Sequence, residues 1–289
     1  MTPRASVIVR CKDEEKFLEC ALRSLRRQTV EPEIIIVDSG STDRSLEIAK
    51  RWCDKLIEIP AESFTFGHAL NVGAESASAP FHFALSAHCH AHRDDWIELA
   101  LTRYERSDVG AVCGYHALPD GSPLIGVFYQ DAKHARAHPF WGFSNHGSSW
   151  RASVWKEHEF DATILSSEDR EWAQRITEAG WVIAFDPQLA VDMSHAWRTP
   201  GELFRRQRLA ARAIAGFNDV TEYRLRDAVR EWWSLVPDQR HSPWLYRIDP
   251  RRLGGLAGKY AGSRDVARRS ARSSARGAAP ATPAGGNDG

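Results

Sequence analysis

The chain has 289 residues, 43% of them hydrophobic and 26% charged, and its formal net charge at pH 7 is zero. This composition is typical of a globular protein, long enough for one large core or two smaller ones. No segment approaches the ~18–20 apolar residues that cross a bilayer, and the start of the chain lacks the apolar region of a signal peptide. Five scattered cysteines without a CxxC pair argue against a disulfide scaffold or a zinc ribbon. We therefore expect a cytoplasmic protein.

Charge is unevenly distributed along the chain. The segment from Arg251 onward contains eight Lys or Arg and two Asp, a net charge of +6, so the rest of the chain carries −6. A basic Arg/Ser tail is more often a solvated extension or a tether to an anionic membrane than a nucleic-acid site. We expect no nucleic-acid partner and leave open a peripheral contact with the inner face of a membrane.

The first half alternates short β-rich segments with amphipathic helical patterns. Strands are predicted at residues 6–9, 33–38, 55–59, 81–86 and 109–115, and helices at 14–28, 43–52, 67–77 and 94–105. This order is typical of βαβ units, which build a mostly parallel sheet with helices on both faces. The predicted fold class is α/β and Rossmann-like.

The pattern changes after Tyr115. Residues 116–145 are rich in proline and aromatic side chains and predict a long irregular binding loop. Further elements are predicted as a helix at 166–180, strands at 181–185 and 189–193, and basic helical structure from 200 to about 234. The resulting division is a catalytic domain over 1–198, with halves 1–115 and 116–198, a helical extension over 199–262, and a tail over 263–289. The tail has almost no large apolar residues, so we expect it to be disordered.

Three polar groups follow predicted strands, at residues 10–15, 38–43 and 88–90. Ligands bind outside the carboxyl ends of the strands in an open parallel sheet, so these groups predict a nucleotide site. The chain has neither a dinucleotide-binding GxGxxG motif nor a P-loop.

Six segments, taken together, carry a family resemblance. They read SVIVRCKDEE, IIIVDSGSTDRS, FTFGHALNVGAESA, ALSAHCHAHRDDW, SNHGSSWRASVW and SSEDREWAQR. In this order and spacing, over about residues 5–200, the chain resembles family-2 glycosyltransferases with the GT-A fold, nearest to rhamnosyltransferase-like polysaccharide-assembly enzymes. The resemblance implies an inverting enzyme that transfers a sugar from a nucleotide diphosphate sugar to a hydroxyl acceptor, in surface polysaccharide or lipid-linked glycan synthesis.

The resemblance assigns donor contacts to Arg10, Lys12, Glu14, Glu15, Asp38, Ser39, Asp43, His68, Asn71 and Arg93. Asp38 would meet the base or ribose of the donor. The alternative is that Asp38 and Asp43 serve only as turn and capping residues. His68 and Asn71 would approach the diphosphate, or else pack a buried helix.

The resemblance also assigns the catalytic and acceptor residues. Asp169 would accept the proton of the acceptor hydroxyl, with Glu168 as second choice. Acids in the first turn of a helix are also favoured by the helix dipole without any catalytic role. Asn145 and Trp150 would lie on the acceptor side.

Histidines stand where many family members carry an acidic DxD-type motif, after the fourth predicted strand. Here that place reads Ala87-His88-Cys89-His90. Imidazole suits Mn²⁺ better than Mg²⁺, so His88, His90 and His195 are candidate ligands of a divalent cation. Alternatively, histidines and Arg93 bind the diphosphate without a metal, or the site is inactive. A zinc hydrolase that uses the HxHxH stretch and a non-catalytic sugar-nucleotide-binding module are the rival functions.

The basic helical segment at residues 203–217 has two interpretations. It could lie at a membrane surface, where lipid-linked acceptors reside, or pack against the catalytic domain. Its Arg205, Arg206 and Arg208 could instead meet the phosphates of the donor.

Overall fold

The computed structural model describes residues 3–193, 199–218, 223–234 and 250–277. Its centre is an eight-stranded sheet in the order β3-β2-β1-β4-β8-β6-β9-β7. The strands are β1 (Ala5–Cys11), β2 (Glu33–Asp38), β3 (Lys55–Glu58), β4 (Phe81–Ser86), β6 (Val109–Gly114), β7 (Phe128–Gln130), β8 (Gly147–Arg151) and β9 (Val182–Asp186). A separate two-stranded sheet pairs β5 (Cys89–His90) with β10 (Asp192–Met193). The predicted α/β fold class is confirmed.

The first half of the sheet follows the predicted pattern. Strands β3, β2, β1 and β4 run parallel. In β1, Val7 and Val9 pack on one face of the sheet and Ile8 on the other, and all three are fully buried. Burial on both faces explains the unbroken apolar runs from which these strands were predicted.

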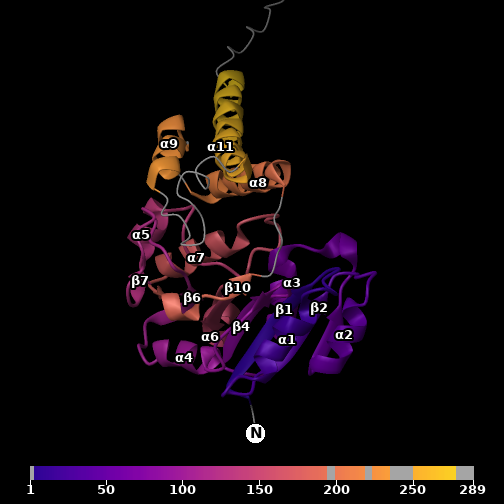
Figure 1. Cartoon of the computed structure of the whole chain (residues 1–289). Coiled ribbons are helices and arrows are strands. Elements are labelled where there is room, and N and C mark those ends of the chain that lie inside the picture. Colours follow the sequence, from indigo (N-terminus) through magenta and orange to yellow (C-terminus); the bar gives the residue numbers. More distant parts are fainter. Residues whose placement is uncertain (1–2, 194–198, 219–222, 235–249, 278–289) are drawn as a thin grey trace, which may run out of the picture.

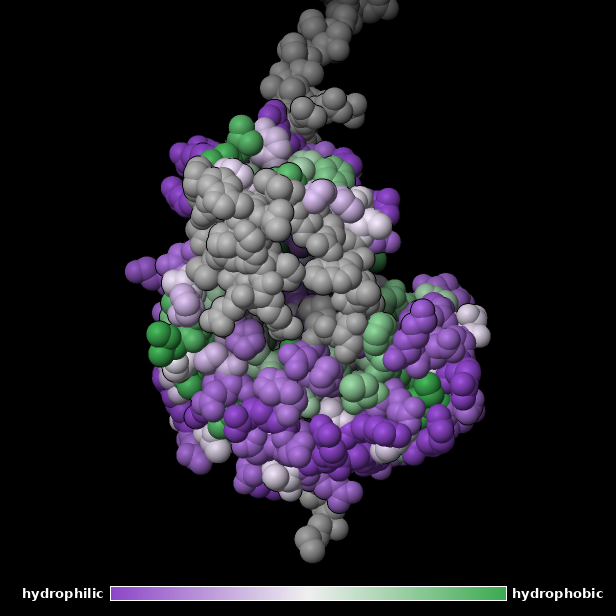
Figure 2. Space-filling view, viewed as in Figure 1, coloured by the Kyte–Doolittle hydropathy of each residue, from purple (hydrophilic) through white to green (hydrophobic). Residues whose placement is uncertain are grey.

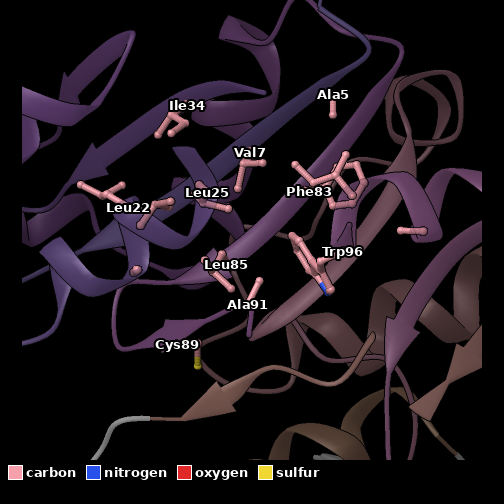
Figure 3. Packing of buried hydrophobic residues seen from close by; sticks show 14 of the residues in the cluster. Ala5, Val7, Leu22, Leu25, Ile34, Phe83, Leu85, Cys89, Ala91 and Trp96 are labelled. Atoms are coloured by element: carbon pink, nitrogen blue, oxygen red, sulfur yellow. The ribbon is translucent and has the colours of Figure 1, made fainter. Parts of the chain in front are cut away.

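Helices cover both faces of the sheet (Figure 1). One face packs against α1 (Leu18–Arg26), α2 (Ser45–Trp52) and α4 (Trp96–Arg103), and the other against α3 (Phe66–Ser76), α6 (Ala152–Glu157) and α7 (Glu168–Glu178). Figure 3 shows Leu22 and Leu25 of α1 beside Val7 of β1, and Trp96 of α4 against Phe83 of β4. This packing fixes the carboxyl ends of β1 and β4, where the polar groups lie.

The second half departs from the prediction in its order. Strand β8, which was not predicted, lies antiparallel between β4 and β6. The irregular segment at 116–145 contains β7 and α5 (Ala132–Ala137). Strand β8 reads GSSWR, with only one large apolar residue, so its sequence carries no strand signal. Its glycine is needed, because a Cβ atom on Gly147 would lie 2.6 Å from a methyl group of Val191.

Three helices, α8 (Pro200–Phe217), α9 (Leu225–Ser234) and α11 (Pro250–Gly277), gather at the end of the molecule opposite the N-terminus (Figure 1). Helix α8 begins with a capping box made by Thr199 and Glu202. The disorder predicted from residue 263 is wrong as far as Gly277, and residues 278–289 lie outside the described part. The segment is rich in Ala and Arg, which are strong helix formers.

A glycine seam joins α11 to α8. A Cβ atom on Gly254, Gly258 or Gly262 would lie 2.4–2.5 Å from a backbone carbonyl oxygen of α8. Asp265 of α11 also pairs with Arg208 and Arg212 of α8, at 2.8 and 2.6 Å. Helix α8 is therefore packed against α11, a partner that neither of its two interpretations named, and Arg208 is engaged with α11. Among the described helices, none is long and apolar enough to cross a membrane.

Candidate functional site

A cavity of about 580 Å³ lies where α7, α8 and α11 meet the ends of β1 and β4. Seven residues singled out in the sequence line it: Arg10, His88, Asn145, Glu168, Asp169, Arg205 and Arg206. They come from five separate segments or turns of the chain. The fold therefore brings together the residues predicted for catalysis, for the acceptor side and for the motif after the fourth strand.

Arg10, Asn145 and Glu168 form a buried polar group. We call these three residues and Asp169 the cavity cluster. Asn145 donates from Nδ2 to Glu168 Oε1 at 3.3 Å, and Arg10 Nη1 lies 3.7 Å from the same oxygen. Arg10 also donates to the carbonyl of Asn145 at 3.1 Å. Burial, reinforced by the neighbouring Asp169, raises the pKa of Glu168 to about 7, although Arg10 and Asn145 oppose this shift. Glu168 can therefore change protonation state near neutral pH.

The first turn of α7 positions Glu168 and Asp169. Ser167 has a left-handed backbone (φ 66°), which only a minority of non-glycine residues adopt, directly before Glu168. Glu168 is buried, at 4% exposure, whereas Asp169 is half-buried on the cavity wall. The Oδ1 of Asp169 accepts the backbone N–H of Arg170 at 2.9 Å. Asp169 is thus the more accessible of the two carboxylates.

Cations dominate the charge of the cavity. Its lining contains five: Arg10, Arg170, Arg205, Arg206 and Lys259. Within the described part of the chain, Glu168 and Asp169 are the only carboxylates that line it. This excess of positive charge favours an anionic ligand. The sequence analysis did not predict Arg170 or Lys259 as site residues. Lys259 lies on α11, far along the chain from the other lining residues, and no sequence motif connects it with them.

A second polar group, the loop cluster, joins the segments after β1 and β2. The Oδ1 of Asp38 accepts the backbone N–H groups of Gly40 and Ser41 at 2.9 and 2.8 Å, and its Oδ2 accepts the Ser41 hydroxyl at 2.5 Å. Ser39 donates from Oγ to the Cys11 carbonyl at 3.2 Å. Asp38 is buried and accepts hydrogen bonds from its own turn. This turn-forming role is the alternative that the sequence left open beside a nucleotide contact.

The remaining loop-cluster acids cross between the two loops. Asp43 accepts the backbone N–H groups of Glu15 and Ser45, at 3.0 and 2.9 Å. Glu15 accepts the N–H of Arg44 at 3.2 Å, and Lys12 donates to the Gly40 carbonyl at 2.5 Å. Asp13, in a left-handed conformation (φ 50°), accepts the N–H of Thr42 at 2.7 Å. The two loops are therefore fastened to each other by their own acids; none of these residues lines the cavity.

His88 connects the two clusters. Its Nδ1 lies 2.8 Å from Glu14 Oε1, while the residue also lines the cavity. The ring of His146, which the sequence reasoning missed, lies 6.3 Å from that of His88. Burial, with a smaller effect from Arg206 and Arg10, lowers the pKa of His146 to about 3, so this residue is neutral at physiological pH. Its position next to Asn145 was its only sequence signal.

The histidines after β4 do not converge on one point. His90 Nε2 and His92 Nδ1 lie 3.7 and 3.6 Å from Asp192 Oδ2, whereas His88 pairs with Glu14. His88 sits in the turn before β5 and His90 within that strand, so alternation does not align them. Within the described residues, no group of three or more His, Cys, Asp and Glu is placed to hold a metal ion. The ligand set built on His88 and His90 and the zinc-hydrolase site are therefore not supported, and His195 lies outside the described residues.

Four other predicted residues lie away from the cavity lining. Asn71 donates to the Phe160 carbonyl at 2.8 Å and accepts from the Trp155 indole at 3.0 Å, so it fastens α3 to the second half. Trp150 is fully buried in the core, which corrects its placement on the acceptor side. Arg93 forms a two-point pair with the Asp95 carboxylate at 2.8 and 2.7 Å. The half-buried His68 lies in the first turn of α3.

Comparison with known proteins finds a family model and relatives that this chain resembles. A family model described as glycosyl transferase family 2 matches residues 6–142. The O-antigen chain rhamnosyltransferase WbaN of Salmonella anatum is 28% identical over 207 residues, which cover 63% of this chain and 63% of WbaN. The chain thus spans less than two thirds of the length of that relative.

Two solved structures show the fold. The mannosyltransferase PcManGT from Pyrobaculum calidifontis, in complex with GDP-Man and Mn²⁺, matches with a TM-score of 0.61 at 18% identity, covering 98% of this chain and 77% of that one. Glucosyl-3-phosphoglycerate synthase from Mycobacterium tuberculosis, in complex with Mn²⁺, UDP and glucosyl-3-phosphoglycerate, matches with a TM-score of 0.57 at 14% identity, covering 76% and 82%. These similarities confirm the predicted GT-A fold.

Proposed function

We propose that this chain, whose residues 6–142 match the model of glycosyl transferase family 2, transfers a sugar, with inversion, from a nucleoside diphosphate sugar to a hydroxyl group of a glycan. The 28% identity to an O-antigen rhamnosyltransferase supports a surface polysaccharide or lipid-linked glycan as the acceptor. The observation that carries the proposal is the cavity in which Glu168 and Asp169 face a set of cations.

The chemistry needs one base and one stabilised leaving group. We assign Asp169 as the base, because it is the more accessible carboxylate on the cavity wall. It takes the proton of the acceptor hydroxyl as that oxygen attacks the anomeric carbon. The bond between the anomeric carbon and the diphosphate oxygen breaks, and the electron pair leaves with the nucleoside diphosphate.

Glu168 is assigned as a positioning residue. Its carboxyl group is held by Asn145 and Arg10, so it fixes the Arg10 guanidinium on the cavity wall. The Oδ1 of Asn145 is buried and has no hydrogen-bond partner among the described residues. Buried polar atoms are nearly always paired, so this oxygen is a candidate acceptor for a hydroxyl of the bound sugar.

The charge of the leaving diphosphate is assigned to the cationic wall. Arg10, Arg170, Arg205 and Arg206 supply guanidinium groups, which bind phosphate oxygens in pairs. The described residues do not present a fitting ligand set for a divalent cation, so no step is routed through a metal. The loop cluster is assigned to the base and ribose, which would meet its exposed backbone and the outer edge of its acids.

Replacement of the base is the central test. In Asp169→Asn, transfer should fall about 10²–10⁴-fold because proton removal is lost, while donor affinity stays within about twofold. The measurement is product formation with a panel of nucleoside diphosphate sugars, with donor binding followed by thermal shift. The control is Asp161→Asn, which removes a carboxylate outside the cavity lining. Undiminished turnover in Asp169→Asn would reject the base, and stabilisation by no nucleotide would reject the function.

Chelation tests how the leaving group is stabilised. After dialysis against EDTA, the cationic wall should sustain turnover, and Arg206→Met should reduce it. Turnover that is lost with EDTA and restored by Mn²⁺ better than by Mg²⁺ would instead show a metal held by imidazole ligands.

A further inference from the structure

A groove of about 300 Å³ separates α9 from α11, away from the catalytic cavity. Every side chain that lines it has an apolar body: Leu225, Ala228, Val229, Trp232, Leu253, Leu256, Ala257 and Tyr260. Three of them are exposed at its edges, Leu225 at 63%, Val229 at 47% and Leu253 at 45%. Hydrophobic surface is visible among hydrophilic surface at this end of the molecule (Figure 2).

Basic residues are frequent in and beside the two helices that form this groove. The sequence of α11 contains eight Lys or Arg and one Asp, a net charge of +7. Arg224, Arg226 and Arg230 are exposed on and beside α9. The acids of this region already have partners, since Asp265 pairs with Arg208 and Glu231 with Lys259. The groove is thus an apolar strip with exposed arginines on and beside α9, and its other helix has a basic sequence.

The groove lies one helix away from the catalytic cavity. Tyr260 of α11 lines the groove, whereas its neighbour Lys259 lines the cavity and lies 5.5 Å from the centre of the Phe140 ring. A surface that binds at the groove would therefore hold the cavity close to that surface. The face of α8 that packs against α11 could not bind such a surface, because α11 covers that face.

We propose that the groove between α9 and α11 docks on an anionic membrane surface. Its apolar side chains would enter the boundary between headgroups and acyl chains, while the arginines contact lipid phosphates. A second copy of the chain is a poorer occupant, because two grooves face to face would oppose two helices of charge +7. The inference does not depend on which sugar is transferred, and its test requires no turnover.

The experiment is co-sedimentation of the full chain with lipid vesicles. Vesicles with about one third phosphatidylglycerol should bind it, vesicles of phosphatidylcholine alone should not, and raised salt should weaken the binding. The double variant Leu225→Glu/Val229→Glu should bind at least about tenfold more weakly, because it places two carboxylates in the strip. Ile125→Glu is the matched control, since Ile125 is 92% exposed in a loop and should leave binding unchanged.

Folding and oligomerisation are checked alongside. Nucleotide-dependent thermal stabilisation should be retained in every variant, and Val229→Ser, a milder change, should weaken binding about threefold. Equal binding to both vesicle types, or undiminished binding of the double variant, would overturn the proposal. The wild type could instead form a dimer. If the double variant then loses the dimer but still binds vesicles, the groove is assigned to a second copy of the chain.

Discussion

The loop cluster and the cavity cluster lie beside the same strand, β1, but satisfy their charged groups differently. In the loop cluster, Asp38 and Asp43 accept backbone N–H groups from their own two loops at 2.8–3.0 Å. In the cavity cluster, Glu168 has a hydrogen bond of 3.3 Å and a cation at 3.7 Å, and the Asn145 Oδ1 has no partner among the described residues. The first cluster is complete without a ligand. The second contains a buried oxygen without a partner among the described residues, which agrees with its proposed role in binding the substrate.

Removing the cation of the cavity cluster should have the largest effect on stability. Arg10→Met leaves Glu168 buried without its charge partner, which costs about 3 kcal/mol of unfolding free energy at pH 8. The cost should shrink at pH 5, where Glu168 is protonated, because burial raises its pKa to about 7. Chemical denaturation at both pH values measures this difference.

Lys12→Met is the matched change in the loop cluster. Lys12 follows β1 by one residue, is half-exposed, donates to the Gly40 carbonyl and lies 3.9 Å from the exposed Asp13 carboxylate. It should therefore cost less than about 1 kcal/mol, equally at both pH values. Equal losses for Arg10→Met and Lys12→Met would remove the distinction between the two clusters.

Removing the titration of Glu168 should have the next largest effect. Its pKa is about 7 in the folded chain, against about 4.3 in an unfolded one. Between these values the folded state binds more protons, so this group makes the wild type less stable as pH rises. Glu168→Gln does not titrate and should gain about 2 kcal/mol relative to the wild type between pH 5 and pH 8. Unfolding curves across this range would show it, and parallel pH profiles for the two proteins would contradict the buried, protonated state.

The two clusters also differ in how far the sequence could predict them. Asp38 and Asp43 lie in one short motif after one strand, where local turn chemistry determines their contacts, so both their position and their alternative roles were readable. The family resemblance named all four residues of the cavity cluster, but other parts of the cavity lining precede β8, whose GSSWR sequence has no strand pattern, or lie on α11, whose Arg, Ser and Ala content resembled a disordered tail. Lys259 and His146 could therefore not be placed in the cavity from the sequence.

The same distinction explains the histidines. Their alternation in the sequence suggested one metal site, but alternation aligns side chains only within a continuous strand. Strand β5 has two residues, and the turn before it sends His88 to Glu14 while His90 and His92 face Asp192. Side-chain direction at a turn is decided by tertiary packing, which the spacing of three letters does not encode.

The glycine seam offers the smallest change that should affect one cluster alone. In Gly258→Ala, the new Cβ would lie 2.4 Å from the carbonyl oxygen of Phe204, so α11 must move away from α8. That overpacking costs 1–3 kcal/mol, and the better helix propensity of alanine returns about 1, so a net loss of about 1 kcal/mol is expected. Gly255→Ala is the control, because its Cβ meets only the Gln207 side chain at 3.7 Å and should stabilise α11 by up to about 1 kcal/mol. Since α8 and α11 line the cavity, and Arg205 and Arg206 of α8 are assigned to the diphosphate, Gly258→Ala should lower both turnover and nucleotide affinity. If Gly258→Ala and Gly255→Ala behave alike in thermal unfolding and in turnover, the close contact of α8 with α11 does not hold the cavity in place.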